Sequence, residues 1–441
     1  MKCAALISGL FLLSLAPVQH VMAEEFRIHP GTDLQDLLGK VAAGDSIVLA
    51  NGTWTDAKLR FESLPGRADK PIHVRAESPG KVVLTGAVEF RVSGKHVVVS
   101  GLVFRNPQRV SDVFDLRTHS KRHAHNCRVT DCVFEQTAGS KNDKDSRWLN
   151  IYGTHNRIDH CYFAGKRNRG TTLVVWVSPV IGSHRIDHNH FGPRPELGKN
   201  GGETIRIGTS DVSELNNRTV VERNYFDRCN GEGEIISNKS CENIYRHNLF
   251  DRSEGTLTLR HGHRCEVDGN VFLGHTASDT GGVRIIGSDH RVTHNHFEGL
   301  RGDAERAAVC FMNGIPDGPL HTYAPVRNAL VAHNTFIDCK VSMEFGVRAS
   351  QKIPAVPADC RVIQNSFLPG KWELFRVQAK PENFTWSGNR YQIGKTRGAD
   401  LVDIERFDIE LHRGVDGLRR PSGAKPFDLP SPGNTGPSWR R

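Results

Sequence analysis

The chain has 441 residues, of which 37% are hydrophobic and 24% charged, so it can bury a sizeable core and is not a low-complexity sequence. Lys and Arg number 58 against 49 Asp and Glu, and the resulting net charge of +9 favours an acidic partner without identifying it. With only 4 Met and as many as 43 Gly, the composition favours strands and turns over helix bundles.

The N-terminus has the pattern of a secretory signal peptide. Lys2 precedes an apolar run over residues 4–18, and Val21 and Ala23 are the small residues of a cleavage site. The run is too short to cross about 30 Å of hydrocarbon, and no later segment is long and apolar enough to do so. We therefore predict a signal peptide over residues 1–23, a periplasmic or extracellular mature protein, and no membrane span.

The cysteines do not indicate a metal site. Of the 10 in the chain, Cys3 leaves with the signal peptide, and the 9 that remain form no C-x-x-C pair. An odd number without such pairs disfavours both a zinc site and a dense disulfide framework. Small buried thiols within a stack of strands are the expected arrangement.

The most prominent feature of the sequence is an internal repeat of the form V-x-x-N-x-F. It recurs from residues 96–105 to residues 383–392, with its aromatic residues about 29 positions apart on average. Asn stands two residues before the aromatic residue in 8 of the 11 repeats. The aromatic positions are Phe104, Phe134, Phe163, Phe191, Phe226, Phe250, Phe272, Phe297, Phe336, Phe367 and Tyr391.

Short alternating strands that recur with this period predict an all-β, single-stranded parallel β-helix. Successive coils lie about 4.8 Å apart, so the aromatic residues are expected to form one interior stack and the Asn residues a second ladder at a turn. Leucine-rich repeats and propellers are disfavoured, because the L-x-x-L-x-L spacing and the W-D dipeptide are missing. The first strand is predicted over residues 46–55, after an N-terminal capping helix that starts at Thr32 and includes Leu34, Leu37 and Leu38.

The repeat ends near residue 395. We predict one β-helix catalytic domain over residues 24–395, followed by a C-terminal region over residues 396–441. Residues 401–411 are expected to form a capping element. From Arg419 onwards Pro, Gly, Ser and Arg dominate, so a disordered tail is expected.

A second series of strands, often opened by Gly, carries the candidate chemistry. Four consecutive coils contain Gly202-ETIRIG, Gly233-EIISNK, Gly255-TLTLRHG and Gly282-VRIIG. Their exposed positions change from coil to coil and are polar or charged, which suggests a surface for a polymer, although a solvated face with incidental charge has the same pattern. These residues are Glu203, Arg206, Glu232, Glu234, Lys239, Arg260, His261, His263 and Arg284.

Spacing favours the functional interpretation. Glu232 and Glu234 are predicted on the same side of one strand, about 6.5–7 Å apart, where a cation would relieve their repulsion. Asn200 falls one coil earlier and can add an amide oxygen, so the set suits calcium. A glycosidase pair is the alternative use of two carboxylates, but such a pair must flank the bond that it cleaves. Lys239 and Arg260 are separated by about one coil and are expected to be neighbours.

Three stretches carry a resemblance to a known family. They are Asn200-GGETIRIG, Glu232-GEIISNKSCEN and Gly255-TLTLRHGHRCEVDGN. Together they resemble polysaccharide lyase family 6, whose members are right-handed parallel β-helix enzymes that include alginate lyases and chondroitinase B. The resemblance covers residues 25–395. The E-x-E-x4-K motif and the R-H-G that follows it are its most specific parts.

The resemblance implies a role for each matching residue. Asn200, Glu232 and Glu234 would bind Ca²⁺, Lys239 would be the general base and Arg260 the general acid. The implied reaction is β-elimination on a uronic-acid polymer. Since a guanidinium is a reluctant proton donor, the assignment of Arg260 is the weaker one.

We therefore predict a secreted, calcium-dependent alginate lyase that leaves 4,5-unsaturated uronate ends. A dermatan sulfate or chondroitin lyase of the same family is one alternative, and a non-catalytic carbohydrate-binding β-helix is another. A nucleic-acid partner is disfavoured by export and by the modest positive charge. The oligomeric state is left open. The residues predicted to line substrate subsites are Arg206, His261, His263 and Arg284.

Overall fold

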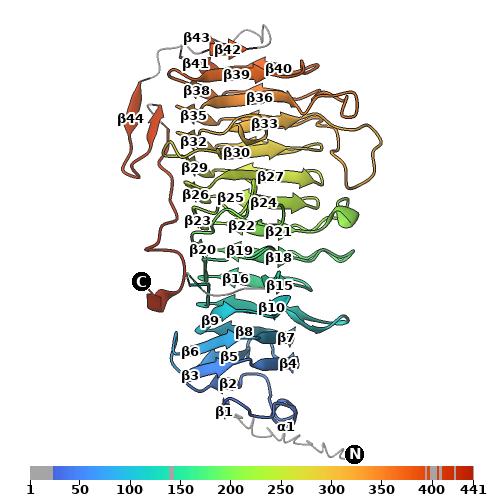
Figure 1. The fold of residues 1–441 in the computed structure, drawn as a ribbon, viewed down its shortest axis with the longest axis vertical. Helices are drawn as coiled ribbons and strands as arrows, with labels where there is room; N and C mark the ends of the chain where they lie inside the picture. The colour runs from blue at the N-terminus through green and yellow to red at the C-terminus, as the bar shows by residue number, and fades with distance from the viewer. Residues whose placement is uncertain are drawn as a thin grey trace, which may run out of the picture.

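The computed structural model describes residues 23–137, 139, 144–392, 395–397, 405–406, 410–421 and 424–440. Apart from Ala23, the predicted signal peptide lies outside these residues. The described chain winds into a parallel β-helix, in which each coil adds one strand to each of three long sheets (Figure 1). Among these residues, no helix is long and apolar enough to cross a membrane.

The three sheets, here called A, B and C, follow one another within each coil, so the predicted fold class is confirmed. In spatial order, sheet A consists of β1 (Glu25–Ile28), β2 (Ser46–Leu49), β5 (Ile72–Ala76), β8 (Val97–Ser100), β13 (Arg128–Thr130), β16 (Arg157–Asp159), β19 (Arg185–Asp187), β22 (Val220–Glu222), β25 (Ile244–Arg246), β28 (Glu266–Asp268), β31 (Arg291–Thr293), β34 (Leu330–Ala332), β37 (Arg361–Ile363) and β40 (Thr385–Ser387).

Sheet B carries the aromatic residues of the repeat. It consists of β3 (Gly52–Thr55), β6 (Val82–Gly86), β9 (Leu102–Pro107), β14 (Val133–Glu135), β17 (Tyr162–Ala164), β20 (His190–Phe191), β23 (Tyr225–Asp227), β26 (Leu249–Asp251), β29 (Val271–Leu273), β32 (His296–Glu298), β35 (Thr335–Ile337), β38 (Ser366–Leu368), β41 (Arg390–Tyr391) and β43 (Glu405–Arg406).

Sheet C contains the strands opened by Gly, and it is parallel except where β11 meets β12. It consists of β11 (Arg117–His119), β12 (Arg122–His125), β7 (Glu89–Lys95), β10 (Asp112–Asp115), β15 (Arg147–Ile151), β18 (Leu173–Val175), β21 (Ile205–Ile207), β24 (Glu234–Lys239), β27 (Gly255–His261), β30 (Thr280–Ile285), β33 (Val309–Met312), β36 (Val341–Val347), β39 (Glu373–Val377) and β42 (Lys395–Arg397), with β4 (Lys58–Pro65) also paired to β7.

The repeated V-x-x-N-x-F segment is two strands rather than the single strand that we predicted. In the coil of β31 and β32, His294 lies between the strands with φ +55°, a left-handed conformation that turns the chain. Val292 therefore belongs to sheet A and Phe297 to sheet B, with Asn295 at the corner. Both apolar side chains still point into the coil.

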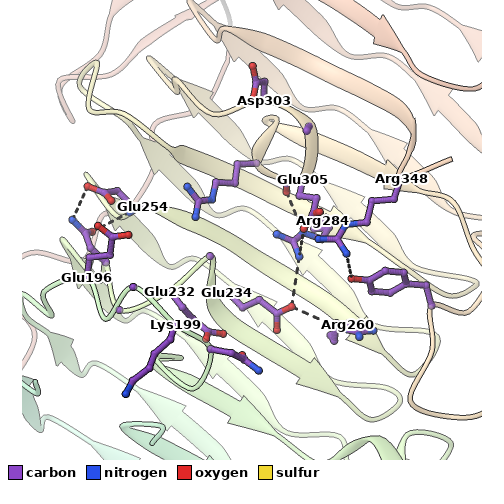
Figure 2. A pocket seen from close by; sticks show the side chains of 18 residues that line it. Glu196, Lys199, Glu232, Glu234, Glu254, Arg260, Arg284, Asp303, Glu305 and Arg348 are labelled. Atoms are coloured by element: carbon purple, nitrogen blue, oxygen red, sulfur yellow. Dashed lines mark hydrogen bonds and ion pairs between the residues drawn. The ribbon is translucent and has the colours of Figure 1, made fainter. Parts of the chain in front are cut away.

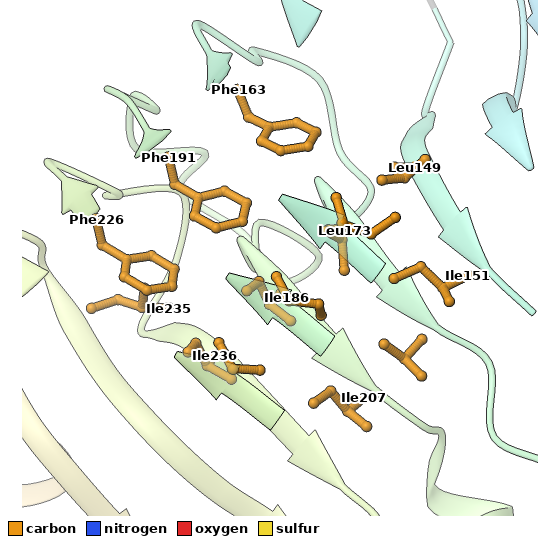
Figure 3. Close-up of a cluster of buried hydrophobic side chains, with 14 of the residues drawn as sticks. Leu149, Ile151, Phe163, Leu173, Ile186, Phe191, Ile207, Phe226, Ile235 and Ile236 are labelled. Atoms are coloured by element: carbon orange, nitrogen blue, oxygen red, sulfur yellow. The ribbon is translucent and has the colours of Figure 1, made fainter. Parts of the chain in front are cut away.

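The aromatic residues form the predicted interior stack. Every pair of consecutive aromatic residues from Phe104 to Tyr391 is in register between neighbouring strands of sheet B. From Phe104 to Phe367 the rings stack with centroids 4.5–5.1 Å apart. Trp54 and Leu84 extend the same row towards the N-terminus. Figure 3 shows part of the stack facing the Leu and Ile side chains of the interior.

The predicted Asn ladder is also present. The Asn270 side chain accepts hydrogen bonds from the backbone and side-chain amides of Asn248, and its own Nδ2 donates to the Tyr245 carbonyl and to Asn295. Its donors and acceptor are thus satisfied within a buried corner, where an unmade bond would cost about 1–3 kcal/mol. All nine described cysteines are buried and free, as expected.

The N-terminal end differs in detail from the prediction. Only one helical turn, α1 (Gln35–Leu38), stands where we predicted a capping helix, although Leu34 and Leu37 do pack against the core. The strand predicted over residues 46–55 is divided between β2 in sheet A and β3 in sheet B. Three-residue 3-10 helices occur at η1 (Ser210–Val212), η2 (Ala304–Arg306) and η3 (Ser438–Arg440).

The C-terminal segment is ordered where the structure describes it, in contrast to the predicted disordered tail. After the antiparallel hairpin of β44 (Leu411–Arg413) and β45 (Arg419–Pro421), residues 424–440 run back along the side of the β-helix (Figure 1, dark red). Much of the predicted capping element at residues 401–411 lies outside the described residues. The large side chains Phe427, Leu429 and Trp439 are spaced along the tail, and each of them contacts the β-helix.

Phe427 and Leu429 pack against an outward-facing cluster that includes Tyr225 and Leu249. Further along, Trp439 donates from its indole nitrogen to the Asp131 carbonyl at 3.0 Å. These contacts fix the tail to sheet B and to the corner between sheets A and B.

Candidate functional site

An open groove of about 690 Å³ lies on the outer face of sheet C (Figure 2). Its lining includes five of the residues predicted from the sequence, which come from β24, β27, β30 and the loops before β21 and β24. They are Asn200, Glu232, Glu234, Arg260 and Arg284. The candidate cation ligands and the candidate general acid therefore do share one surface.

Glu232 is held by two backbone amides of the neighbouring coil. Gly201 and Gly202 donate to its Oε2 at 2.7 and 3.1 Å. Gly201 has φ +101°, and a Cβ on Gly202 would lie 2.3 Å from the Gly231 carbonyl oxygen, so the two coils approach closely only because these positions are glycine. Since β24 begins at Glu234, Glu232 belongs to the turn before the strand, and our placement of both carboxylates on one strand was wrong.

A register shift explains how Glu234 reaches the groove. On β24, Glu234 pairs with Thr256 but Ile236 pairs with Leu257, so Ile235 is an extra residue. Ile235 and Ile236 are both buried in the core, and Glu234 then points outwards. Its Oε1 lies 3.5 Å from Arg284 Nη1 and 3.9 Å from Arg260 Nε.

Negative charge accumulates around Glu232. Burial raises the pKa of this carboxyl to about 7, and the buried Glu203 adds to the effect, as does Glu234 more weakly. The two glycine N–H groups lower the pKa but do not offset these causes. A cation placed beside the carboxylates would stabilise their ionised forms.

The donor set of this region fits a hard divalent cation. It comprises the carboxylates of Glu232 and Glu234 and the amide of the exposed Asn200, all of which are oxygen donors around one groove. In the described part of the chain, no group of three or more His, Cys, Asp or Glu side chains is placed to hold a metal ion. Water or substrate oxygens would therefore have to complete the coordination.

Lys239 and Arg260 are brought together by a second register shift. Asn238 pairs with Leu259 but Lys239 pairs with His261, so Arg260 is the extra residue on β27. Lys239, half-buried at the end of β24, thus lies beside Arg260 and His261 on the adjacent strand, as the spacing predicted. Bulges of this kind often redirect side chains next to active sites. Lys239 is not among the residues that line the groove itself.

Arg260 is constrained by an aromatic ring more than by an acid. Its guanidinium carbon lies 4.2 Å from the centroid of Tyr323, and burial lowers its pKa. Its Nη1 is buried and has no hydrogen-bond partner in the described structure. The side chain as a whole is 20% exposed and lines the groove.

The residues predicted to bind substrate have different environments. Arg284 is only 6% exposed and bridges Glu234 and Glu305, and Arg206 lies over Trp176 with its guanidinium carbon 5.4 Å from the ring centroid.

The two histidines and Arg206 are not groove-lining residues. His261 is hydrogen-bonded to Ser210, and burial lowers its pKa to about 3, so its imidazole is neutral at neutral pH. His263 faces Ser288 and Glu214.

Several groove residues were missed by the sequence analysis, notably Tyr323, Arg348 and Glu305. Tyr323 lies in the long connection between β33 and β34, and the other two come from coils beyond the four with the motif. One signal was available for Tyr323. The aromatic positions Phe297 and Phe336 are 39 residues apart, well above the average interval, which indicates an inserted loop.

The chain is similar to known proteins over most of its length. The family model described as Chondroitinase B matches residues 28–371. The solved structure of the PL6 family alginate lyase AlyGC is similar with a TM-score of 0.88 and 36% identity over 94% of this chain, which spans 58% of the length of that lyase.

A mannuronic acid specific family 6 lyase from human gut microbiota is similar with a TM-score of 0.72 and 32% identity, over 86% of this chain and 92% of that one. The PL6 family polysaccharide lyase Pedsa3628 from Pseudopedobacter saltans shares the fold at 20% identity, with a TM-score of 0.73 over 94% of this chain and 99% of that one. A comparison with curated proteins returned no match.

Proposed function

The chain belongs to polysaccharide lyase family 6, and on that basis we propose that it cleaves alginate by β-elimination. Alginate is favoured because the similar structures described above at 36% and 32% identity are an alginate lyase and a mannuronic acid specific lyase. Dermatan sulfate is the second candidate, because the matching family model is that of chondroitinase B. Export by the N-terminal segment is part of the same proposal, since both polymers lie outside the cytoplasm.

The observation that carries the proposal is the placement of Lys239 beside Arg260 across the β24–β27 bulge. In the proposed reaction, Lys239 takes the proton from C5 of a uronate, and the electron pair left on carbon forms the C4=C5 double bond. The C4–O bond breaks and its electron pair leaves with the oxygen, which then takes a proton from water. Arg260 stabilises the charge that develops on this oxygen through its free N–H edge.

We propose that Asn200, Glu232 and Glu234 would hold a calcium ion in the groove. When bound there, the ion would neutralise the uronate carboxylate and so make the neighbouring C5 proton more acidic. Support comes from the oxygen-only donor set and from the raised pKa of Glu232, which is caused first by burial and then by Glu203, with a smaller contribution from Glu234, and which a nearby cation would lower. Calcium removal by a chelator is expected to reduce turnover, and re-addition of Ca²⁺ to restore it.

The test of the proposal is the ultraviolet absorbance of the new double bond. The protein is incubated with poly-mannuronate, poly-guluronate, mixed alginate and dermatan sulfate, and the products are sized. Lys239→Ala should abolish the signal, whereas the matched control Lys352→Ala, at an exposed position outside the groove, should not. No unsaturated product from any of the four polymers, or unchanged turnover by Lys239→Ala, would overturn the proposal.

A further inference from the structure

The orientation of the Arg260 guanidinium has no obvious source among its acidic neighbours. The side chain is 20% exposed, and its one carboxylate partner in the described structure, Glu234, is 3.9 Å away. That distance is too long for the paired hydrogen bonds by which a carboxylate usually fixes an arginine. With Nη1 buried and unpartnered, another group must hold the guanidinium in place.

Tyr323 is that group. Its ring centroid lies 4.2 Å from the Arg260 guanidinium carbon, well within the distance of a cation–π contact. Tyr323 is itself held by its backbone and by its hydroxyl group. The Tyr323 carbonyl accepts a hydrogen bond from the Ile315 amide at 2.8 Å, and its hydroxyl accepts one from Arg348 Nη1 at 3.1 Å.

The contacts continue beyond Tyr323 and return to Arg260. Arg348 pairs with Glu305, and Glu305 accepts from Arg284 both at its carboxylate (3.2 Å) and at its backbone carbonyl (3.1 Å). Arg284 then lies 3.5 Å from Glu234, which faces Arg260 (Figure 2). The result is a closed circuit of six side chains, which come from β24, β27, β30, η2, the loop between β33 and β34, and the position directly after β36.

We propose that Tyr323 is a positioning residue, which holds the plane of the Arg260 guanidinium so that its N–H edge stays free for the leaving oxygen. This inference rests on the proposed lyase function. The physical reason is that a carboxylate binds the edge of a guanidinium, and so would occupy the donors that the reaction needs. An aromatic face binds the charge from above the plane and leaves that edge open.

The first test compares two substitutions at one position. Tyr323→Leu removes the aromatic face, and we expect kcat to fall by about 5- to 30-fold with little change in KM, as corresponds to the loss of one desolvated cation–π contact. Tyr323→Phe keeps the face and loses only the hydroxyl contact, so its kcat should stay within about threefold of the unsubstituted protein. Equal losses in both variants, or no loss in the leucine variant, would overturn the inference.

A double-mutant cycle tests whether the effect passes through Arg260. Arg260→Lys keeps a positive charge but has no plane to orient, so adding Tyr323→Leu to it should lower kcat by less than about twofold. The same 5- to 30-fold loss in both backgrounds would show that Tyr323 acts independently, against the proposal. Where leucine lowers the melting temperature, Tyr323→Met provides a second non-aromatic side chain for the same cycle.

The outcomes for this inference and for the proposed function are separable. An unsubstituted protein without activity on any polyuronate contradicts the function itself. An active protein in which Tyr323→Leu turns over normally contradicts only the positioning role.

Discussion

Two explanations compete for the buried charge of Arg284 in the groove, namely substrate binding and internal support. The guanidinium is 6% exposed and lies between Glu234 at 3.5 Å and Glu305 at 3.2 Å. The sequence predicted a subsite residue, whereas the contacts indicate that Arg284 keeps two carboxylates in place. The substitution Arg284→Gln is therefore expected to act on stability as well as on activity.

The expected magnitude can be worked out from the contacts. Two unit charges about 3.3 Å apart interact by about 5 kcal/mol at an effective dielectric constant of about 20. Desolvation of Arg284 and the partial exposure of both carboxylates offset much of this, and the loss of one partner of a buried pair costs about 3–5 kcal/mol. We take the lower limit, about 3 kcal/mol. With an unfolding entropy of roughly 2.1 cal/mol/K per residue, this lowers the melting temperature of a chain of this size by about 3 °C.

The assay is thermal unfolding of Arg284→Gln alongside steady-state kinetics on the active polymer. Arg206→Gln is the matched control, since Arg206 stacks over Trp176 and forms no ion pair with a carboxylate among the described residues. Its melting temperature should change by less than about 1 °C. If Arg284→Gln melts normally and only its KM rises, Arg284 is a substrate ligand and the reasoning from its burial is wrong.

Three further predictions concern the scaffold. Phe272→Ala should lower the free energy of unfolding by about 3–5 kcal/mol in chemical denaturation, because Phe272 is fully buried between two stacked rings. An unchanged denaturation midpoint would contradict the stabilising role of the aromatic stack. Burial raises the pKa of Glu298, but hydrogen bonds from His296 and Arg419 more than offset it, so the pKa falls from 4.5 to about 2. Since this pKa is lower in the folded state, the ionised Glu298 carboxyl stabilises the folded protein fully above pH of about 4.5, and this stabilisation is lost as the pH falls towards about 2. Glu298→Gln should therefore flatten the acid dependence of the melting temperature over that range. Deletion of residues 424–441 should lower the melting temperature but leave kcat unchanged, because the tail contacts sheet B and the corner between sheets A and B rather than the groove. A loss of kcat at temperatures where the truncated protein stays folded would contradict this prediction.

Sequence reasoning predicted those parts of the structure in which the same stacking constraint recurs from coil to coil. An aromatic residue in each repeat, and an Asn in 8 of the 11, must stack on their counterparts in the neighbouring coils, so their spacing alone predicts sheet B and the ladder. The pairing of Lys239 with the Arg260 region was predictable for the same reason, since one coil separates them.

The parts that were missed depend on departures from the repeat. The extra residues Ile235 and Arg260 shift the register of β24 and β27, and a period of two cannot anticipate such a shift. Tyr323 reaches the groove from an inserted loop whose path is set by tertiary contacts. The docking of the tail was not predicted, because the prediction used its Pro and Gly content, whereas a few large apolar residues make its contacts with the β-helix.

The tail also bears on how the molecule unfolds. In a solenoid each coil contacts only its neighbours, so the terminal coils can unfold one at a time. Here the Ser438 amide donates to Asp131, a residue 307 positions earlier in the chain, at 2.8 Å. A brace of this length means that opening the last coils strains contacts on much earlier ones. We therefore expect amide hydrogen exchange in the C-terminal coils to be as slow as in the middle coils. When the contact between the tail and Asp131 is removed, exchange should become progressively faster towards the C-terminal end of the β-helix.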